Sequence, residues 1–279
     1  MARLTISTRS QLLGQSIDFT VVMPDGPSRS FSAAPSAASL KAEEATGSSR
    51  KVVGERADAP RVCYLLHGTS GNHRTWGDHV VLHREASRRH LAFVSMSAGR
   101  SFYLNWDAGL PWSDFLAFEL PELVADCVRV DTTPGSAIIA GLSAGGYGAF
   151  HAALTHPQLY AAAGSLSGVL DIASAYNRPR RAELYRGAFV TDNIAGSDVD
   201  LLALLRAGSA DGTLLPKLWA ACGSSDHVLP QSRRFLEVAA ECGVDLTYRE
   251  WEGDHDWEFW TPAAAEFFAW LSHEGLCLG

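Results

Sequence analysis

The chain has 279 residues, of which 47% are hydrophobic, so its length allows one large domain with a sizeable core. Its formal net charge is −8, so it does not have the excess of basic residues that is typical of nucleic-acid-binding proteins. No apolar run approaches the ~18 residues that a membrane span needs. The five cysteines form no C-x-x-C pair, which predicts reduced thiols in a cytoplasmic protein and neither a disulfide framework nor a metal site. Residues 1–9 contain no apolar core of the kind found in a signal peptide.

Strand-like and helix-like segments alternate along the chain and predict an α/β fold, with a mostly parallel sheet covered by helices on both faces. The first two strands are expected to pair antiparallel. The expected strands are Leu4–Ser7, Ile17–Met23, Val62–Leu66, Leu91–Ser97, Ala137–Ala140, Ala161–Ser165, Leu218–Cys222 and Leu246–Trp251. The expected helices are Thr75–Arg89, Phe115–Val130, Gly146–Leu154, Gln231–Glu241 and Trp257–Leu271.

Two segments interrupt this alternation within the single expected domain, residues 1–279. The stretch from about Asp25 to Pro60 is rich in Ser, Ala, Gly and Glu, with few large apolar side chains. Such a segment buries too little surface to offset the entropy of ordering, so a mobile loop is expected there. The stretch from about Asp171 to Leu215 has a mixed helical pattern, and it is expected to form a small cap inserted after the sixth strand.

A single pentapeptide carries the strongest functional signal of the chain. Gly141–Gly145 reads GLSAG, fits the pattern G-x-S-x-G, and lies between the strand-like run Ser136–Ala140 and the helix-like run Gly146–Leu154. This context is typical of a nucleophile elbow, in which a sharp turn lifts the serine hydroxyl above the sheet. The first N–H groups of the following helix then point at the reacting atom. Ser143 is therefore the predicted nucleophile.

A serine hydroxyl needs a histidine to accept its proton and a carboxylate to orient that histidine. In α/β-hydrolases these residues follow the order serine, acid, histidine along the chain. Asp226 comes just after the seventh expected strand, and His255 comes after the last one, before the final helix. The order and the positions predict Asp226 as the acid and His255 as the base.

Each of these two assignments has a competitor. His227 is the alternative base, although its place next to Asp226 in sequence makes it hard for the two side chains to face each other. Asp171 is the alternative acid, because it follows the strand before the one that presents Asp226. Most other histidines, including His151, are expected at the surface.

Stabilisation of the oxyanion requires two backbone N–H groups. In this fold one comes from the loop after the third strand and the other from the residue after the nucleophile. These positions predict the N–H groups of Thr69 and Ala144. Gly68 precedes Thr69, and the lack of a side chain there lets the backbone approach a substrate oxygen, so Gly68 is also a candidate pocket residue.

Aromatic residues gather just after the fourth expected strand, at the sheet edge where ligands bind in α/β folds. Tyr103 and Trp106 are the candidate pocket residues in this group. The alternative is that these rings only pack the loop against the core.

The chain resembles the tributyrin-esterase branch of the putative-esterase (esterase D) family of α/β-hydrolases. The segments that carry the resemblance are Tyr64–Trp76, Gly99–Tyr103, Glu119–Glu122, Gly141–Gly148, Cys222–Asp226 and Gly253–Trp257. The resemblance implies a serine carboxylesterase that acts on short acyl esters. Two features depart from the relatives. Ala144 stands where they often have Met, which predicts an altered acyl preference, and the Cys-containing loop of S-formylglutathione hydrolases is missing after the third strand.

Together these patterns predict a serine carboxylesterase that hydrolyses short-chain acyl esters through an acyl-enzyme intermediate. The expected partner is a small-molecule ester, with no cofactor, no metal and no nucleic acid, and assembly into a homo-oligomer stays open. A thioesterase resembling S-formylglutathione hydrolase, or an acyltransferase, would use the same three residues. A binding module on a hydrolase fold is the alternative outside enzymes, because a fold does not fix a function.

Overall fold

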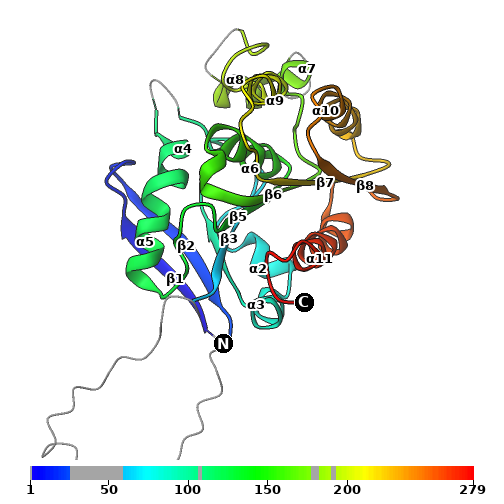
Figure 1. The fold of residues 1–279 in the computed structure, drawn as a ribbon. Coiled ribbons are helices and arrows are strands. Elements are labelled where there is room, and N and C mark those ends of the chain that lie inside the picture. Colours follow the sequence, from blue (N-terminus) through cyan, green and yellow to red (C-terminus); the bar gives the residue numbers. More distant parts are fainter. Residues whose placement is uncertain (1, 26–58, 106–108, 177–181, 190–192) are drawn as a thin grey trace, which may run out of the picture.

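The computed structural model describes residues 2–25, 59–105, 109–176, 182–189 and 193–279. Its centre is an eight-stranded sheet with the order β1-β2-β4-β3-β5-β6-β7-β8 (Figure 1). The strands are β1 Ala2–Arg9, β2 Ser16–Met23, β3 Arg61–Leu66, β4 Leu91–Met96, β5 Ala137–Leu142, β6 Tyr160–Leu166, β7 Lys217–Gly223 and β8 Leu246–Trp251. All eight predicted strands are present, each with a shift of at most a few residues at its ends.

The strand directions also follow the prediction. β1 pairs antiparallel with β2, and β2 pairs antiparallel with β4. Every other neighbouring pair, from β4 through β3 and β5 to β8, is parallel. The carboxyl ends of these parallel strands therefore share one edge of the sheet, where loops can bring distant residues together.

Helices cover both faces of the sheet. They are α2 Thr75–His79, α3 Leu82–Arg89, α4 Trp112–Asp114, α5 Leu120–Cys127, α6 Ala144–Thr155, α7 Ile172–Tyr176, α8 Ala182–Ala188, α9 Leu201–Ala210, α10 Leu229–Glu241 and α11 Trp257–His273. A short π-helix, η2 Phe115–Glu119, and a 3-10 helix, η3 Pro157–Leu159, are also present. In the described ranges no helix has both the length and the apolar character that crossing a membrane would require.

Successive side chains of each strand pack into two separate hydrophobic cores, one on each face of the sheet. In β3, Tyr64 and Leu66 belong to the core that includes α5, α6, α9 and α10, whereas Cys63 and Leu65 belong to the core of α2, α3 and α11. Because a strand points successive side chains to opposite faces, a continuous apolar run predicts a strand buried on both sides. Figure 1 shows α11 with α2 and α3 on one side of the sheet and α6 on the other.

Two predicted helices differ from the observed ones. The segment Thr75–Arg89 is broken between α2 and α3, where Val80 takes an extended backbone. β-branched side chains are poor helix formers, and the burial of Val80 in the core compensates for the break. The predicted helix Phe115–Val130 begins with the π-helix η2, in which the Leu120 N–H donates to the Phe115 carbonyl. Pro121 follows directly and has no N–H to donate.

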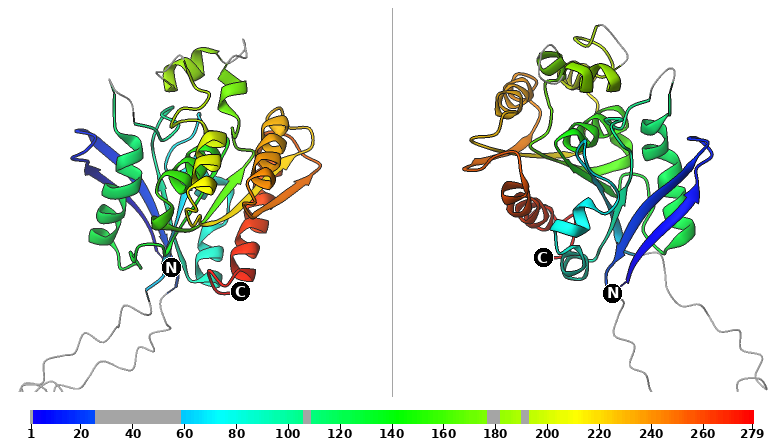
Figure 2. Two further views of the ribbon diagram at one scale, coloured as in Figure 1. Left: turned by 45° about the horizontal axis from the view of Figure 1, so that its top comes forward. Right: turned by 180° about the vertical axis from the view of Figure 1, so that it is seen from behind.

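The segment predicted to form a cap, residues 171–215, contains α7, α8 and α9 where it is described. Figure 2 shows α7 and α8 at the end of the molecule opposite the two termini. The rings of Tyr185 and Phe189 pack against Phe102, which joins this segment to the main core. Whether it acts as a cap stays a prediction. The loop predicted between Asp25 and Pro60 lies almost entirely outside the described residues.

The prediction that His151 lies at the surface is wrong. His151 is only 7% exposed, on α6, and its Nε2 lies 3.0 Å from the Asp198 carbonyl oxygen. One helical turn earlier, the Tyr147 hydroxyl donates to the carbonyl of Val199 at 2.7 Å. The helix that follows Ser143 thus holds two consecutive carbonyls of the segment before α9.

Burial lowers the pKa of His151 from an ordinary 6.5 to about 4. The unfolded chain therefore takes up a proton near pH 6.5 that the folded protein accepts only near pH 4. Below pH 6.5 the unfolded chain binds a proton that the folded protein does not, so the free energy of unfolding falls by up to about 1.4 kcal/mol per pH unit as the pH drops. Above pH 6.5 this loss is absent.

We expect His151→Gln, whose amide does not titrate in this range, to reduce the dependence of stability on pH. The free energy of unfolding in urea, measured at several pH values between 4.5 and 7.5, checks this. His273→Gln, at a side chain that is 86% exposed, is the matched control and should keep the slope of the unaltered protein. An unchanged slope in His151→Gln would contradict the lowered pKa of His151 as a source of this pH dependence.

Candidate active site

Ser143 stands at a sharp turn between β5 and α6. Its backbone has φ +54° and ψ −117°, a conformation that non-glycine residues rarely adopt and that stores strain. The turn is tight on both sides. A Cβ at Gly141 would lie 2.1 Å from the Gly145 carbonyl oxygen, and a Cβ at Gly145 would lie 2.3 Å from the carbonyl oxygen of Leu66. Both glycines of the GLSAG motif are therefore required by close packing of the backbone.

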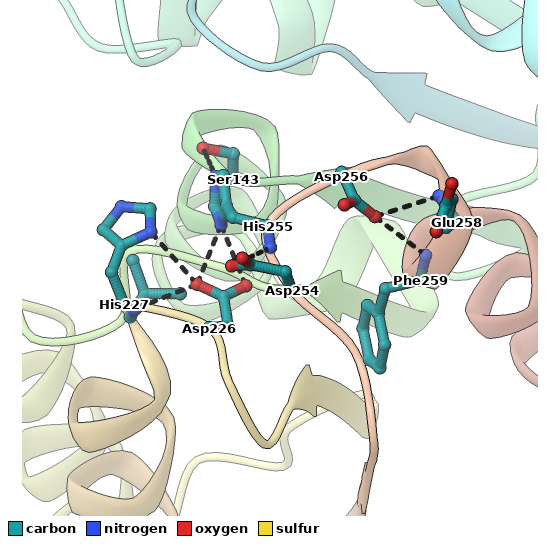
Figure 3. A network of polar contacts seen from close by, with 9 residues as sticks. Ser143, Asp226, His227, Asp254, His255, Asp256, Glu258 and Phe259 are labelled. Atoms are coloured by element: carbon teal, nitrogen blue, oxygen red, sulfur yellow. Dashed lines mark hydrogen bonds and ion pairs between the residues drawn. The ribbon is translucent and has the colours of Figure 1, made fainter.

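Ser143, His255 and Asp226 meet at the carboxyl edge of the sheet, as the sequence predicts. Nε2 of His255 lies 2.9 Å from Oγ of Ser143, and Nδ1 lies 3.0 and 2.9 Å from the two carboxylate oxygens of Asp226 (Figure 3). Asp226 follows β7, and His255 lies on the loop between β8 and α11. The imidazole thus bridges the carboxylate and the hydroxyl.

Asp226 is held in its charged form. Burial alone would raise the pKa of this carboxyl, but the hydrogen bond and charge of His255 and the N–H of Val228, which donates at 2.9 Å, outweigh it and bring the pKa below its ordinary value. A charged carboxylate accepts the proton on Nδ1 of His255. Nε2 is then left as the acceptor that faces the Ser143 hydroxyl.

The two competing residues lie in other contacts. His227 packs its ring against that of His255, with centroids 4.5 Å apart, and its Nδ1 lies 3.3 Å from Oδ1 of Asp226. Asp171 accepts the N–H of Ser174 at the start of α7. Among the described contacts, the hydroxyl of Ser143 is paired with His255.

The loop after β3 reaches the same place. Gly68 and Thr69 line a cavity together with Ser143, and a Cβ at Gly68 would lie 2.9 Å from Cδ1 of Leu142. Ala144 is the first residue of α6, where backbone N–H groups have no partner within the helix. Of the predicted residues, Gly68 and Thr69 thus line the cavity with Ser143, and Ala144 follows Ser143 directly in the chain.

The family model described as "Putative esterase" matches residues 53–271, which is more than half of the chain. The chain belongs to this esterase family.

The comparisons with single proteins agree with this assignment. The esterase is 30% identical to an acetyl esterase from Caldicellulosiruptor saccharolyticus over 227 residues, which is 76% of this chain and 83% of the relative. Together with the family match, this relative makes the chain a carboxylic ester hydrolase and therefore an enzyme.

Two structures from Staphylococcus aureus share the α/β-hydrolase fold. The fluorophosphonate-binding serine hydrolase FphF superimposes with a TM-score of 0.81 at 24% identity, covering 97% of the esterase and 98% of FphF. The S-formylglutathione hydrolase FrmB gives a TM-score of 0.77 at 23% identity, with the same coverage. These likenesses confirm the predicted fold.

His67, which the sequence analysis did not single out, shapes the loop of Gly68 and Thr69 in the esterase. Its Nε2 accepts the N–H of Ala98 at 3.0 Å, so Nδ1 carries the proton and donates to the Gly68 carbonyl at 2.6 Å. Burial lowers the pKa of His67, which favours the neutral ring, and the two hydrogen bonds fix its tautomer. The bond holds the Gly68 carbonyl, and so the peptide whose N–H belongs to Thr69.

Tyr103 supports the same loop through its hydroxyl group. It is buried with a positive φ of 62°, and its hydroxyl donates to the His67 carbonyl at 2.9 Å. A Cβ at Gly148 would lie 2.5 Å from the Tyr103 ring, so α6 also fits closely around this side chain. Tyr103 therefore does not line the cavity beside Ser143 but supports the loop that does. Trp106 lies outside the described residues.

We expect Tyr103→Phe to lower kcat/KM by about two- to tenfold, since a hydrogen bond of this kind contributes roughly 0.5–1.5 kcal/mol. The loss should appear mainly in kcat, because the hydroxyl positions the loop of Gly68 and Thr69 and does not line the cavity. Steady-state kinetics on p-nitrophenyl acetate, with the melting temperature measured beside it, checks this. Tyr64→Phe, at another buried tyrosine in the same core, is the matched control and should leave kcat unchanged.

The cavity beside Ser143 and His255 has a volume of about 350 Å³. Its walls are the loop Gly68–Gly71, the side of α2 that carries His79, and the two tryptophans Trp257 and Trp260. The His79 and Trp257 rings stack with centroids 4.0 Å apart and planes 6° apart. These rings have no predicted role, and their only signal in the sequence is the position of Trp257 two residues after His255.

Proposed function

We propose that the protein is a serine carboxylesterase that hydrolyses short-chain acyl esters with Ser143, His255 and Asp226. The observation that carries the proposal is the continuous chain of contacts from the Asp226 carboxylate through both ring nitrogens of His255 to the Ser143 hydroxyl, each at 2.9–3.0 Å. Such a chain supplies a nucleophile, a base and a group that orients the base.

In the proposed reaction, Oγ of Ser143 attacks the ester carbonyl carbon while Nε2 of His255 takes its proton. The oxyanion accepts hydrogen bonds from the N–H groups of Thr69 and Ala144. Nε2 then donates the proton to the leaving alcohol, and the acyl group stays on Ser143. A water molecule repeats the sequence on the acyl-enzyme and releases the carboxylic acid.

The size of the cavity supports a short acyl or alcohol group. A volume of about 350 Å³ lies near the lower end of the range of roughly 300–1,000 Å³ that is usual for ligand pockets. The bulky rings of Trp257 and Trp260 limit it on one side. The activity named for the relative, an acetyl esterase, agrees with a small acyl group.

The test is a series of p-nitrophenyl esters from acetate to octanoate, with S-formylglutathione measured beside it. We expect kcat/KM to be highest for the two- to four-carbon acyl groups and to fall by at least about tenfold at eight carbons, since pockets discriminate by a methylene or two at this level. A preference for octanoate would contradict the short-chain proposal. A much higher kcat/KM for S-formylglutathione, the substrate class of the neighbour FrmB, would favour the thioesterase alternative.

A further inference from the structure

Three side chains of metal-ligating type converge beside Ser143. One carboxylate oxygen of Asp226 and one ring nitrogen from each of His227 and His255 lie within 4.8 Å of one another. Figure 3 shows the two imidazoles facing the same carboxylate, each joined to it by a dashed line. The proposed reaction uses Asp226 and His255 but gives no role to His227.

The spacing of these atoms resembles the edge of a zinc coordination shell. Ligands at 2.0–2.1 Å from Zn²⁺ in a tetrahedron lie roughly 3.3–3.4 Å from each other. Oδ1 of Asp226 lies 3.3 Å from Nδ1 of His227 and 3.0 Å from Nδ1 of His255. Two imidazoles and one carboxylate are also a common donor set for Zn²⁺, with a water as the fourth ligand.

An ion can reach the cluster from one side. The side chain of Asp226 is fully buried, and that of His255 is 15% exposed, whereas that of His227 is 42% exposed. His227 is therefore the most exposed of the three side chains and offers the side from which an ion can reach the buried carboxylate.

We propose that Asp226, His227 and His255 form an inhibitory site for Zn²⁺ and similar divalent ions, which switches the esterase off by capturing its base. The proposal rests on the proposed function. The ion binds Nδ1 of His255 and releases the proton from that atom to solvent. The neutral ring then carries its only proton on Nε2, which faces Ser143 and can no longer accept the proton of the serine hydroxyl. The ion also occupies the carboxylate of Asp226.

Inhibition of the chelator-treated protein by ZnCl₂ is the first test, with p-nitrophenyl acetate as the substrate. Activity should fall nearly to zero at saturating Zn²⁺ and return in full with EDTA. Mg²⁺, which prefers an octahedral shell of oxygen ligands, should have no effect. If Zn²⁺ leaves the unaltered protein fully active, the proposal is overturned.

Variants of His227 locate the ion. His227→Gln should keep kcat/KM within about twofold of the unaltered protein and raise the half-inhibitory Zn²⁺ concentration by at least about tenfold, since loss of groups that support a metal lowers affinity by about 10–100-fold. His273→Gln is the matched control. It removes another exposed histidine beside a carboxylate, with Nδ1 3.5 Å from Oε1 of Glu274, and should leave inhibition unchanged. Equal inhibition of the unaltered protein and His227→Gln would place the ion elsewhere and overturn the proposal.

A binding measurement separates this site from the proposed reaction. Isothermal titration of Ser143→Ala with ZnCl₂ should give one ion per chain, and the double variant Ser143→Ala/His227→Gln should bind at least about tenfold more weakly. This measurement needs no turnover. A change at His227 that leaves the affinity unaltered would refute the metal site, whereas full activity in Ser143→Ala would refute the nucleophile and leave the measured Zn²⁺ affinity standing.

Discussion

Ser143→Ala is expected to lower kcat by about three decades or more while the protein stays folded, because the hydroxyl paired with His255 is lost and no other group replaces it. His255→Ala should be nearly as damaging. The Ser143/His255 double variant should be barely worse than either single one, because the nucleophile and its base act as a unit.

The measurements for this prediction are kcat on p-nitrophenyl acetate and the melting temperature of each variant. Ser70→Ala is the matched control, since this serine lines the same cavity, and it should keep kcat within about tenfold. A serine-directed phosphonate should label Ser143 alone. Labelling of a different serine, or near-normal turnover in Ser143→Ala, would show that the nucleophile lies elsewhere.

Asp226→Asn should lower kcat by about four decades, the loss known for the equivalent change in a well-studied serine protease. The amide would donate a hydrogen bond where the carboxylate accepts one, so Nδ1 of His255 would lose its proton and Nε2 would carry it. That tautomer cannot accept the proton of Ser143. The structure of the loop should survive, because asparagine has the same shape and can still accept the N–H of Val228.

Asp171→Asn is the control for the acid. The Asp171 side chain accepts the N–H of Ser174 and lies at the start of α7, so the change should affect stability by about 1 kcal/mol at most and leave kcat near its normal value. Kinetics and urea unfolding of both variants decide between the two acids. A severe loss in Asp171→Asn with a mild loss in Asp226→Asn would move the acid to the earlier strand.

The strands and the positions of Ser143, Asp226 and His255 could be predicted because their signals in the sequence are local. A buried strand such as Val62–Leu66 is a continuous apolar run whatever it pairs with, and the two glycines around Ser143 mark a turn that tolerates no side chain. The order of Ser143, Asp226 and His255 then follows from the fold, because each follows a strand that ends at the same edge.

The features that the sequence could not reveal depend on contacts between distant segments. The polar partner of the buried His151 is the carbonyl of Asp198, 47 positions away, and the chain near His151 does not identify this partner. In the same way, Tyr103 reaches the carbonyl of His67, 36 positions away. The break at Val80 and the π-helix at Phe115 are different, because they lie next to local signals, a β-branched residue and Pro121, that the helical pattern hid.

With Ser143 as the proposed nucleophile, its strained turn implies a conflict between stability and activity. A backbone with φ +54° suits glycine far better than serine, and holding a non-glycine residue in such a conformation costs on the order of 1–3 kcal/mol. The rest of the domain must supply that free energy through its two cores. Selection for thermal stability alone would therefore favour glycine at position 143, and the nucleophilic hydroxyl of the proposed function opposes this change.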